Sequence, residues 1–261
     1  MHLRHHPRTV ARGVTVLASR YAVQLTDVTK RYGEGPDAVL ALDKVSAGIE
    51  SGTFTAVMGP SGSGKSTFLH CAAGLDRPTA GEVRLGDQEL SALRERRLTE
   101  LRRTRIGFVF QAFNLLPSLT VEQNITLPLR LAGRQPEQTW LEHIVTAVDL
   151  GGRLNRFPAQ LSGGQQQRVA IARALVTRPE VIFADEPTGA LDPETARDIL
   201  VLLRQAVTDL HQTVVMVTHD PVAAAHTDQA LFLSAGRIVD GLVAPGADRV
   251  AEVMSGLRRA V

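Results

Sequence analysis

One stretch of nine residues constrains the fold of this chain more than any other. The segment GPSGSGKST, residues 59–67, follows the short apolar run GTFTAVM and precedes residues that favour a helix. Its pattern of Gly, four residues, Gly, Lys and Ser is typical of the phosphate loop that joins a strand to a helix. We therefore expect an α/β fold in which this loop lies at the carboxyl end of a sheet strand.

The composition of the loop suits the binding of a nucleotide triphosphate. Glycines at 59, 62 and 64 allow successive backbone N–H groups to point inward, and a helix that begins near Lys65 adds the positive end of its dipole. Lys65 can reach the terminal phosphates, and the Ser66 hydroxyl can bind Mg²⁺. The predicted ATP-binding residues of this loop are Gly59, Pro60, Ser61, Gly62, Ser63, Gly64, Lys65, Ser66 and Thr67.

A second apolar run, VIFADE at 181–186, ends in two adjacent carboxylates. Asp185 suits a contact to Mg²⁺ through water, and Glu186 can polarise an attacking water as a general base. The alternative is that these acids cap a helix, but Pro187 and the residues after it delay the next helix. His219 ends a similar apolar run, and the phosphate loop at the same sheet edge favours a γ-phosphate contact over a structural role.

Two adjacent glycines stand in front of a helical pattern in LSGGQQQRVAIARAL, residues 161–175. Ser162 can cap this helix, while Gly163 and Gly164 leave its free N–H groups open to a phosphate. The chain then has two predicted phosphate sites, although one nucleotide needs only one phosphate loop. We therefore expect the second site to face the nucleotide of another subunit.

The remaining pattern divides the chain into three parts. Apolar strands without polar alternation, joined by helices, indicate a parallel sheet covered on both faces. Strand signals vanish between 121 and about 177, where we expect helices at 121–132, 138–150 and 164–177. The predicted parts are a basic, disordered extension at 1–21, an ATPase domain at 22–240 with a helical sub-domain at about 112–178, and a C-terminal helical tail at 241–261.

Composition limits the classes of function. The net charge is +2, but the first 20 residues contain four arginines and no acids. The rest of the chain therefore holds 25 basic and 27 acidic residues. This balance does not indicate a basic nucleic-acid-binding protein. The arginines at 94–105 are expected to form a solvated helix face rather than a site for an anionic partner. No apolar run approaches the roughly 18–20 residues that a membrane-spanning helix needs.

The motifs together resemble those of the ATP-binding-cassette ATPases. LSGGQ at 161–165 is similar to the signature of that family, and it lies between the phosphate loop and the Asp-Glu strand, as in the family. The resemblance implies a P-loop NTPase fold with a RecA-like, mostly parallel sheet, a small antiparallel β sub-domain and a helical sub-domain. It also implies ATP and Mg²⁺ as cofactors, hydrolysis of ATP, and a head-to-tail homodimer that holds two ATP molecules.

The resemblance assigns roles residue by residue. It implies that Tyr32 stacks on adenine, that Gln111 touches Mg²⁺ and water, and that His219 is the switch histidine. The implied catalytic residues are Lys65, Gln111, Glu186 and His219, and the implied metal ligands are Ser66, Gln111 and Asp185 through water. The residues implied to contact the partner's ATP are Ser162, Gly163, Gly164, Gln165 and Asp192, the last in a loop, 189–192, that crosses between subunits.

More narrowly, the motifs resemble the subfamily that serves lipoprotein release, macrolide export and cell division. This implies a chain that powers a separate membrane permease for export or for extraction from the membrane. It would lie in the cytoplasm, peripheral on the inner face of the membrane. The permease is expected to dock near Gln111–Leu116, where Phe113, Leu115 and Leu116 are expected to be exposed. Ala190 and Ser51 depart from common family residues without removing a reactive group. The alternatives are a soluble relative that acts on nucleic acid or ribosomes, and a nucleotide-binding regulator without hydrolysis.

Overall fold

The computed structural model describes residues 20–259, and strands and helices are interspersed along this range. The strands are β1 (Tyr21–Tyr32), β2 (Val39–Glu50), β3 (Phe54–Met58), β4 (Ala80–Leu85), β5 (Gln88–Glu89), β6 (Ile106–Phe110), β7 (Val181–Asp185), β8 (Val214–Val217), β9 (Gln229–Ser234) and β10 (Arg237–Val243). The α-helices are α1 (Lys65–Ala72), α2 (Glu95–Arg105), α3 (Val121–Leu131), α4 (Gln138–Ala147), α5 (Gly163–Leu175), α6 (Pro193–Thr208), α7 (Pro221–Ala224) and α8 (Ala247–Arg259). Short 3₁₀ turns lie at Gly35–Asp37 and Pro158–Gln160.

The central sheet has the strand order β10-β9-β3-β8-β7-β6. Every neighbouring pair is parallel except β9 and β10, so the mainly parallel sheet that we expected is confirmed. Because β3, β6, β7 and β8 run in the same direction, their carboxyl ends meet at one edge. The phosphate loop follows β3 at that edge.

Strand β7 shows why the apolar strands lack polar alternation. Val181 and Phe183 pack into a cluster with residues of α1, α2 and the first antiparallel strands. Ile182 and Ala184 point to the opposite face, where they pack against α3, α4, α5 and α6. Both faces of the strand are therefore buried, as expected for a parallel sheet covered by other elements.

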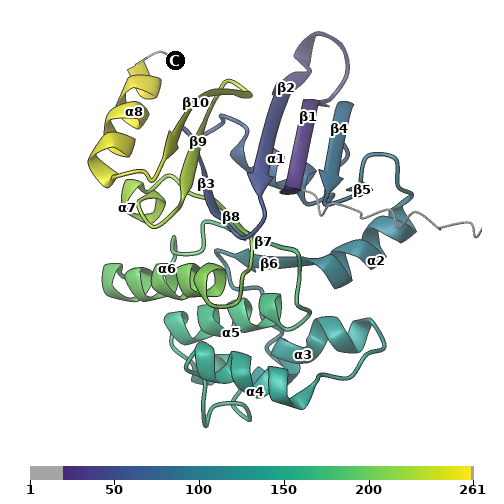
Figure 1. The fold of residues 1–261 in the computed structure, drawn as a ribbon, viewed down its shortest axis with the longest axis vertical. Coiled ribbons are helices and arrows are strands. Elements are labelled where there is room, and N and C mark those ends of the chain that lie inside the picture. The colour runs from purple at the N-terminus through teal and green to yellow at the C-terminus, as the bar shows by residue number, and fades with distance from the viewer. Residues whose placement is uncertain (1–19, 260–261) are drawn as a thin grey trace, which may run out of the picture.

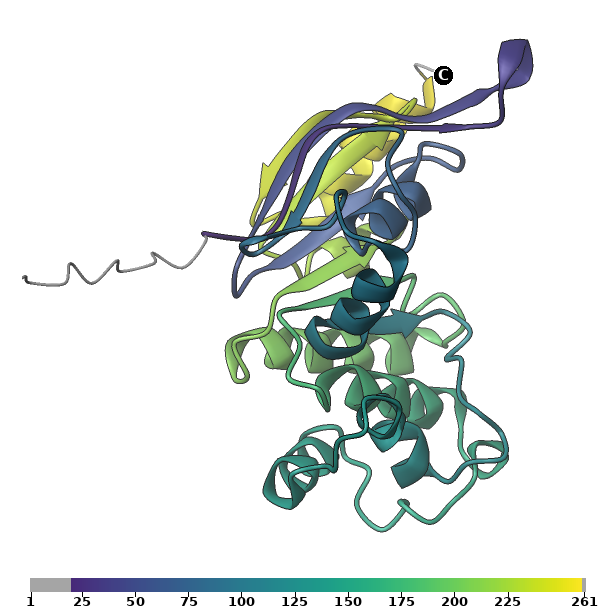
Figure 2. The ribbon, with the colours of Figure 1, turned by 90° about the vertical axis from the view of Figure 1, so that its right-hand side faces the viewer.

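A four-stranded antiparallel sheet, β2-β1-β4-β5, lies at the end of the molecule opposite the helices α3, α4 and α5 (Figures 1 and 2). Its first strand begins at Tyr21, so that residue belongs to the sheet and not to the extension that we placed at 1–21. The rest of that extension, apart from Arg20, lies outside the described residues. The sheet packs over α1, which immediately follows the phosphate loop.

The three helices expected between 121 and 177 are present as α3, α4 and α5. Thr120 caps α3 with a reciprocal pair of hydrogen bonds to Gln123, which fixes where this helix begins. Residues of α3, α4 and α5 share one apolar cluster with the central sheet and α6. The helical sub-domain therefore has no separate core, and α5 connects it to the sheet.

The C-terminal part corrects our division at residue 241. Residues 241–243 pair with β9 as the end of β10, and the helix α8 begins only at Ala247. The sequence pattern missed β9 and β10. Strand β10 is an edge strand whose side chains are largely exposed. Helix α8 packs Val250 and Met254 against Phe232 of β9, so it is part of the core.

Packing of β7 predicts the effect of a single truncation. Phe183 is fully buried and its ring stacks against Phe108 with centroids 6.1 Å apart. Phe183→Ala is expected to lower the free energy of unfolding by about 3–5 kcal/mol, measured by urea denaturation. Val201→Ala on the exposed face of α6 is the control and should cost under about 1 kcal/mol. Equal effects of the two substitutions would contradict this packing.

Candidate nucleotide site

The phosphate loop is held against neighbouring backbone at two of its glycines. Gly59 has φ 154°, and a Cβ there would lie 2.2 Å from the Leu233 carbonyl oxygen. Gly64 has φ 103°, and a Cβ there would lie 2.4 Å from the Ala41 carbonyl oxygen. Both positions exclude a side chain, because such distances are shorter than atoms can approach. The tight loop predicted from the glycine spacing is therefore required by packing as well as by backbone conformation.

Not every residue of the loop presents its N–H group as we expected. The Ser63 N–H donates to the Pro60 carbonyl at 3.2 Å, which closes a turn within the loop. The Ser63 side chain is buried, and its Oγ has no partner among the described residues. Helix α1 begins at Lys65 with Gly64 as its N-cap, so the first free N–H groups of the helix follow directly.

Lys65 lies close to the two carboxylates that end β7. Its Nζ donates to the carbonyl oxygens of Gly59 at 2.9 Å and Pro60 at 2.8 Å. Burial lowers the pKa of this ammonium group, while the charges of Glu186 and Asp185 act in the opposite direction. The structure thus brings together the lysine and the two acids, which are 120 residues and more apart in the sequence.

The predicted metal ligands offer oxygen donors of the type that Mg²⁺ prefers. Burial raises the pKa of Asp185, and the nearby charges of His70 and Lys65 oppose this effect. A divalent cation beside Asp185 would also favour its ionised form. No group of three His, Cys, Asp or Glu side chains clusters anywhere in 20–259. Mg²⁺ is commonly bound through one or two carboxylates together with phosphate oxygens and water, so the Asp185 carboxylate is a donor of a suitable type.

Glu186 has a strained backbone and a fixed carboxylate. Its φ is +44°, a left-handed conformation that costs a non-glycine residue about 1–3 kcal/mol and is typical of functional sites. The Glu186 N–H donates to the Val217 carbonyl at 3.0 Å, and His219 Nδ1 lies 2.8 Å from Glu186 Oε1. Adjacent parallel strands β7 and β8 therefore place the acid and the histidine in direct contact.

Gln111 reaches the same place from β6. A Cβ on Gly189 would lie 2.9 Å from Gln111 Nε2 and 3.3 Å from Glu186 Oε2, so both side chains approach this glycine. The structure therefore gathers Gln111, Glu186 and His219 at one edge, next to Lys65 and Asp185. This arrangement can hold a phosphate and orient a water molecule beside it.

The start of α5 differs in part from the expected open N-terminus. Ser162 Oγ accepts the Gln165 N–H at 3.3 Å, and Gln165 Oε1 accepts the Ser162 N–H at 3.1 Å. Ser162 is confirmed as the cap, but the Gln165 side chain is engaged in its own helix. Gly164 is buried, and a Cβ there would lie 2.4 Å from Thr195 Cγ2. The second glycine is thus required by the packing of α5 on α6.

Two other predicted residues have partners within the chain. Asp192 caps α6 by accepting the Thr195 N–H at 3.0 Å. Hydrogen bonds from the Thr195 hydroxyl and then from its N–H hold the pKa of Asp192 below its ordinary value. Tyr32 ends β1, and its hydroxyl donates to Asp76 at 2.7 Å. Burial raises the pKa of Tyr32, and the Thr67 hydroxyl opposes this rise. The exposed Tyr32 ring therefore lies beside the last residue of the phosphate loop.

The loop after β6 is held by a residue that sequence reasoning missed. Arg173 of α5 donates hydrogen bonds to the carbonyl oxygens of Phe113, at 2.8 Å, and Asn114. Its only sequence signal is its place in the LSGGQ helix. The prediction of three exposed apolar side chains in this loop is wrong for Phe113 and Leu115, which are half-buried. Leu116 alone is exposed, at 45%.

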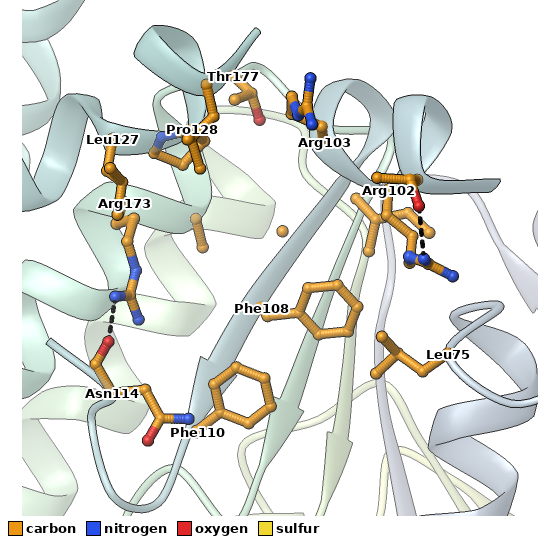
Figure 3. Close-up of a pocket in the computed structure, with 15 residues that line it drawn as sticks. Leu75, Arg102, Arg103, Phe108, Phe110, Asn114, Leu127, Pro128, Arg173 and Thr177 are labelled. Atoms are coloured by element: carbon orange, nitrogen blue, oxygen red, sulfur yellow. Dashed lines mark hydrogen bonds between the residues drawn. The ribbon is translucent and has the colours of Figure 1, made fainter. Parts of the chain in front are cut away.

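A groove of about 440 Å³ lies beside this loop (Figure 3). It is lined by residues of α2, β6, α3 and α5, among them Arg103, Phe108, Phe110, Leu127, Leu131 and Arg173. Because Arg173 contributes to the groove and also holds the loop that follows Gln111, the groove and the nucleotide site share a structural element.

Comparison with known proteins decides the family. A family model described as "ABC transporter" matches residues 42–189. The chain belongs to the ABC transporter family. It is 43% identical over 226 residues to the macrolide export ATP-binding/permease protein MacB of Marinobacter nauticus, and 44% identical over 227 residues to the methionine import ATP-binding protein MetN of Mesorhizobium japonicum. These alignments cover 86% and 85% of this chain, but only 35% and 60% of the relatives.

Solved structures of ABC cassettes have the same fold. The dimeric post-hydrolysis structure of the cassette MJ0796, bound to ADP and Pi, superposes with a TM-score of 0.77 at 42% identity and covers 86% of this chain and 99% of that one. MJ0796 is a protein of Methanocaldococcus jannaschii. The chain spans about a third of the length of MacB, the export relative that it matches.

The packing of Gly164 makes a prediction about α5. Gly164→Ala should lower the free energy of unfolding by about 1–3 kcal/mol, because the new methyl group overlaps Thr195 Cγ2. Adding Thr195→Ser removes that methyl and should restore most of the loss in thermal and urea denaturation. Gly256→Ala on α8 is the control, since its Cβ meets no atom and alanine favours a helix. A double variant as unstable as Gly164→Ala would contradict the close contact.

Proposed function

We propose that this chain binds and hydrolyses ATP as the motor subunit of a transporter, and that it drives a separate membrane permease. The observation that carries the proposal is the meeting of Lys65, Asp185, Glu186 and His219 at one edge of the parallel sheet. The family match and the MacB and MetN relatives support a role in transport. MacB is named for export and MetN for import.

Each residue of the site has a defined task in this proposal. The backbone of 59–64 and the start of α1 bind the β- and γ-phosphates, and Lys65 exchanges its loop carbonyl partners for phosphate oxygens. Tyr32 stacks on adenine from beside Thr67. Ser66, Gln111 and, through water, Asp185 would hold a Mg²⁺ ion, which would supply positive charge to neutralise the phosphates. The same assignment makes ATP and Mg²⁺ the cofactors of the chain.

The contact between Glu186 and His219 supports a division of labour between the two carboxylate oxygens. His219 holds Oε1, which leaves Oε2, near Gln111, free to accept a hydrogen bond from the attacking water. Glu186 acts as the general base by orienting that water and taking its proton. His219 can then contact the γ-phosphate with the other ring nitrogen.

The partner contacts need a second copy of the chain. Ser162 and Asp192 are exposed at the starts of α5 and α6, where free N–H groups and dipole ends attract anions. In a head-to-tail homodimer, Ser162, Gly163, Gly164 and Gln165 of one chain would face the ATP held by the phosphate loop of the other. The dimeric state of MJ0796 supports this arrangement.

The permease would dock in the groove beside the loop after Gln111. MacB is named an ATP-binding/permease protein and is about three times as long as the matched region, so a permease accompanies the cassette in that relative. Leu131 lines the groove with 61% of its surface exposed, which suits an apolar helix of a partner. The structure has no helix within 20–259 that could itself cross a membrane. Docked on a permease of the cell membrane, the chain would be cytoplasmic and peripheral on the inner face of that membrane.

The nucleic-acid alternative has less support. A chain whose residues after the first 20 hold more acidic than basic side chains lacks the basic surface that nucleic-acid machines use. The relatives compared above are named for transport. We therefore expect no nucleic-acid partner.

Glu186→Gln tests the assignment of the base. We expect ATP binding within about twofold of the original chain and a turnover lower by about 10²–10⁴-fold, since a general base contributes in that range. The variant should also form an ATP-dependent dimer in sedimentation velocity, because ATP persists between the two chains. Glu252→Gln on α8 serves as the control. Ordinary turnover of Glu186→Gln would overturn the assignment.

Leu131→Glu tests the groove. Loss of a leucine that the docked permease would cover should weaken binding to the permease in lipid nanodiscs by about 10- to 100-fold, in line with about 1.5–3 kcal/mol of lost burial. Basal ATP hydrolysis should stay within twofold, because Leu131 does not touch the nucleotide site. Val243→Glu on the exposed edge strand β10 is the matched control. Unchanged permease affinity of Leu131→Glu would place the docking surface elsewhere.

A further inference from the structure

Gln167 is a polar side chain that neither the nucleotide site nor the groove explains. It lies in the second turn of α5, and 0% of its surface is exposed. A buried amide costs free energy unless its polar atoms are hydrogen bonded, and Gln167 Oε1 has no partner among the residues described. A methionine of similar size would fill the same space without this cost.

The amide nitrogen of Gln167 joins two loops of the nucleotide site. Nε2 donates to the Pro187 carbonyl at 2.6 Å, and it lies 3.4 Å from the Phe110 carbonyl, which also accepts from it. Pro187 directly follows Glu186, and Phe110 directly precedes Gln111. Phe110 and Asp185 form the last pair of the β6–β7 ladder, so Gln167 bridges these strands where they separate.

The loop after β7 depends on few other anchors. The Glu186 N–H is bound to Val217, and the Gly189 N–H donates back to the Glu186 carbonyl. Pro187 has no N–H, so its carbonyl oxygen is the one backbone group with which it can form a hydrogen bond. That oxygen is bound by Gln167. The bond therefore helps to hold the strained backbone of Glu186 and, through it, the direction of the carboxylate.

The same helix begins with the residues assigned to the partner's ATP. Gln167 lies three and four residues beyond Gly164 and Gly163, which places it on the same face one turn along the helix. One turn spans about 5.4 Å, so Gln167 lies about that far along the helix from the two glycines. A displacement of the start of α5 is thus passed directly to the Pro187 and Phe110 carbonyls.

We propose that Gln167 is a positioning residue that couples the two ATP sites of the dimer. When α5 seats on the ATP held by the partner chain, Gln167 places Glu186 and Gln111 of its own chain for hydrolysis. Each site then becomes competent only when the opposite ATP is engaged. This inference rests on the proposed function, because it requires hydrolysis in a head-to-tail dimer.

Gln167→Met is the main test, since it keeps the volume and removes the amide. We expect kcat for ATP hydrolysis to fall by about ten- to a hundredfold, as a small misplacement of catalytic groups can cause. KM should stay within about threefold, because the phosphate loop is untouched. The Hill coefficient for ATP should fall from above 1 to about 1, and ATP-dependent dimers should still form in a Glu186→Gln background.

Gln212→Met is the matched control. Gln212 is also buried, its Oε1 also lacks a partner within 20–259, and its Nε2 donates to the Leu210 carbonyl at 3.3 Å. It lies just before β8, at the sheet edge opposite the site. We expect this variant to keep kcat and the Hill coefficient within about twofold of the original chain, whatever its stability.

A second variant separates positioning from folding. Gln167→Asn keeps an amide but is one methylene shorter, so it cannot span to Pro187, and it should show the same selective loss of kcat. If both Gln167 variants fold and turn over ATP within twofold of the original chain, or lose activity only in proportion to thermal stability, the inference fails. The proposed function is judged separately, by turnover and ATP-dependent dimerisation of the unsubstituted chain.

Discussion

Parallel pairing of β3, β8, β7 and β6 is the constraint on which the rest of the structure depends. Residues far apart in the sequence meet because these strands end at the same edge. Lys65 follows β3, Gln111 follows β6, Glu186 follows β7 and His219 follows β8. The site needs no long-range side-chain network to assemble, since the backbone ladder already sets the spacing of the strand ends.

The reactive side chains at that edge are held in place by residues that take no part in the proposed reaction. Glu186 keeps a left-handed backbone because Val217 and Gln167 bind the loop around it. Gly189 leaves room for both Gln111 and the Glu186 carboxylate to approach. The hydrogen bonds to the Val217 and Pro187 carbonyls anchor the loop to the backbone. They restrict the motion of the reacting groups more than contacts with exposed side chains would.

Helix α5 connects the parts of the molecule that act on different partners. Its start bears the residues assigned to the second ATP, its middle bridges β6 and β7, and Arg173 near its end holds the loop beside the groove. Its apolar face packs into the same cluster as the sheet and as α3 and α4. A helix packed on this many elements can shift only together with them. A shift of α5 on nucleotide binding would therefore also move the residues that line the groove.

Most of the fold could be predicted from the sequence, because the informative patterns are local. Three such patterns each predict a local conformation. They are the glycines at 59, 62 and 64, the apolar run that ends in Asp185 and Glu186, and the helix cap at Ser162. The edge strand β10 was not predicted, because its apolar residues, in the sequence RIVDGLV, do not alternate with polar ones. The exposure of Phe113 and Leu115 was misjudged, since nothing near them in sequence reveals that α5 and the apolar core cover the loop.

By itself, the sequence determined the chemical groups, the order of the elements and the loops that hold phosphate. The tertiary structure alone decided three contacts. His219 binds Glu186. Thr195 leaves no room for a side chain at Gly164. Gln167 forms a hydrogen bond with the loop after β7. The physical reason is that these contacts join residues on different elements. Their distances depend on how helices and strands pack, and no local pattern of residues records that packing.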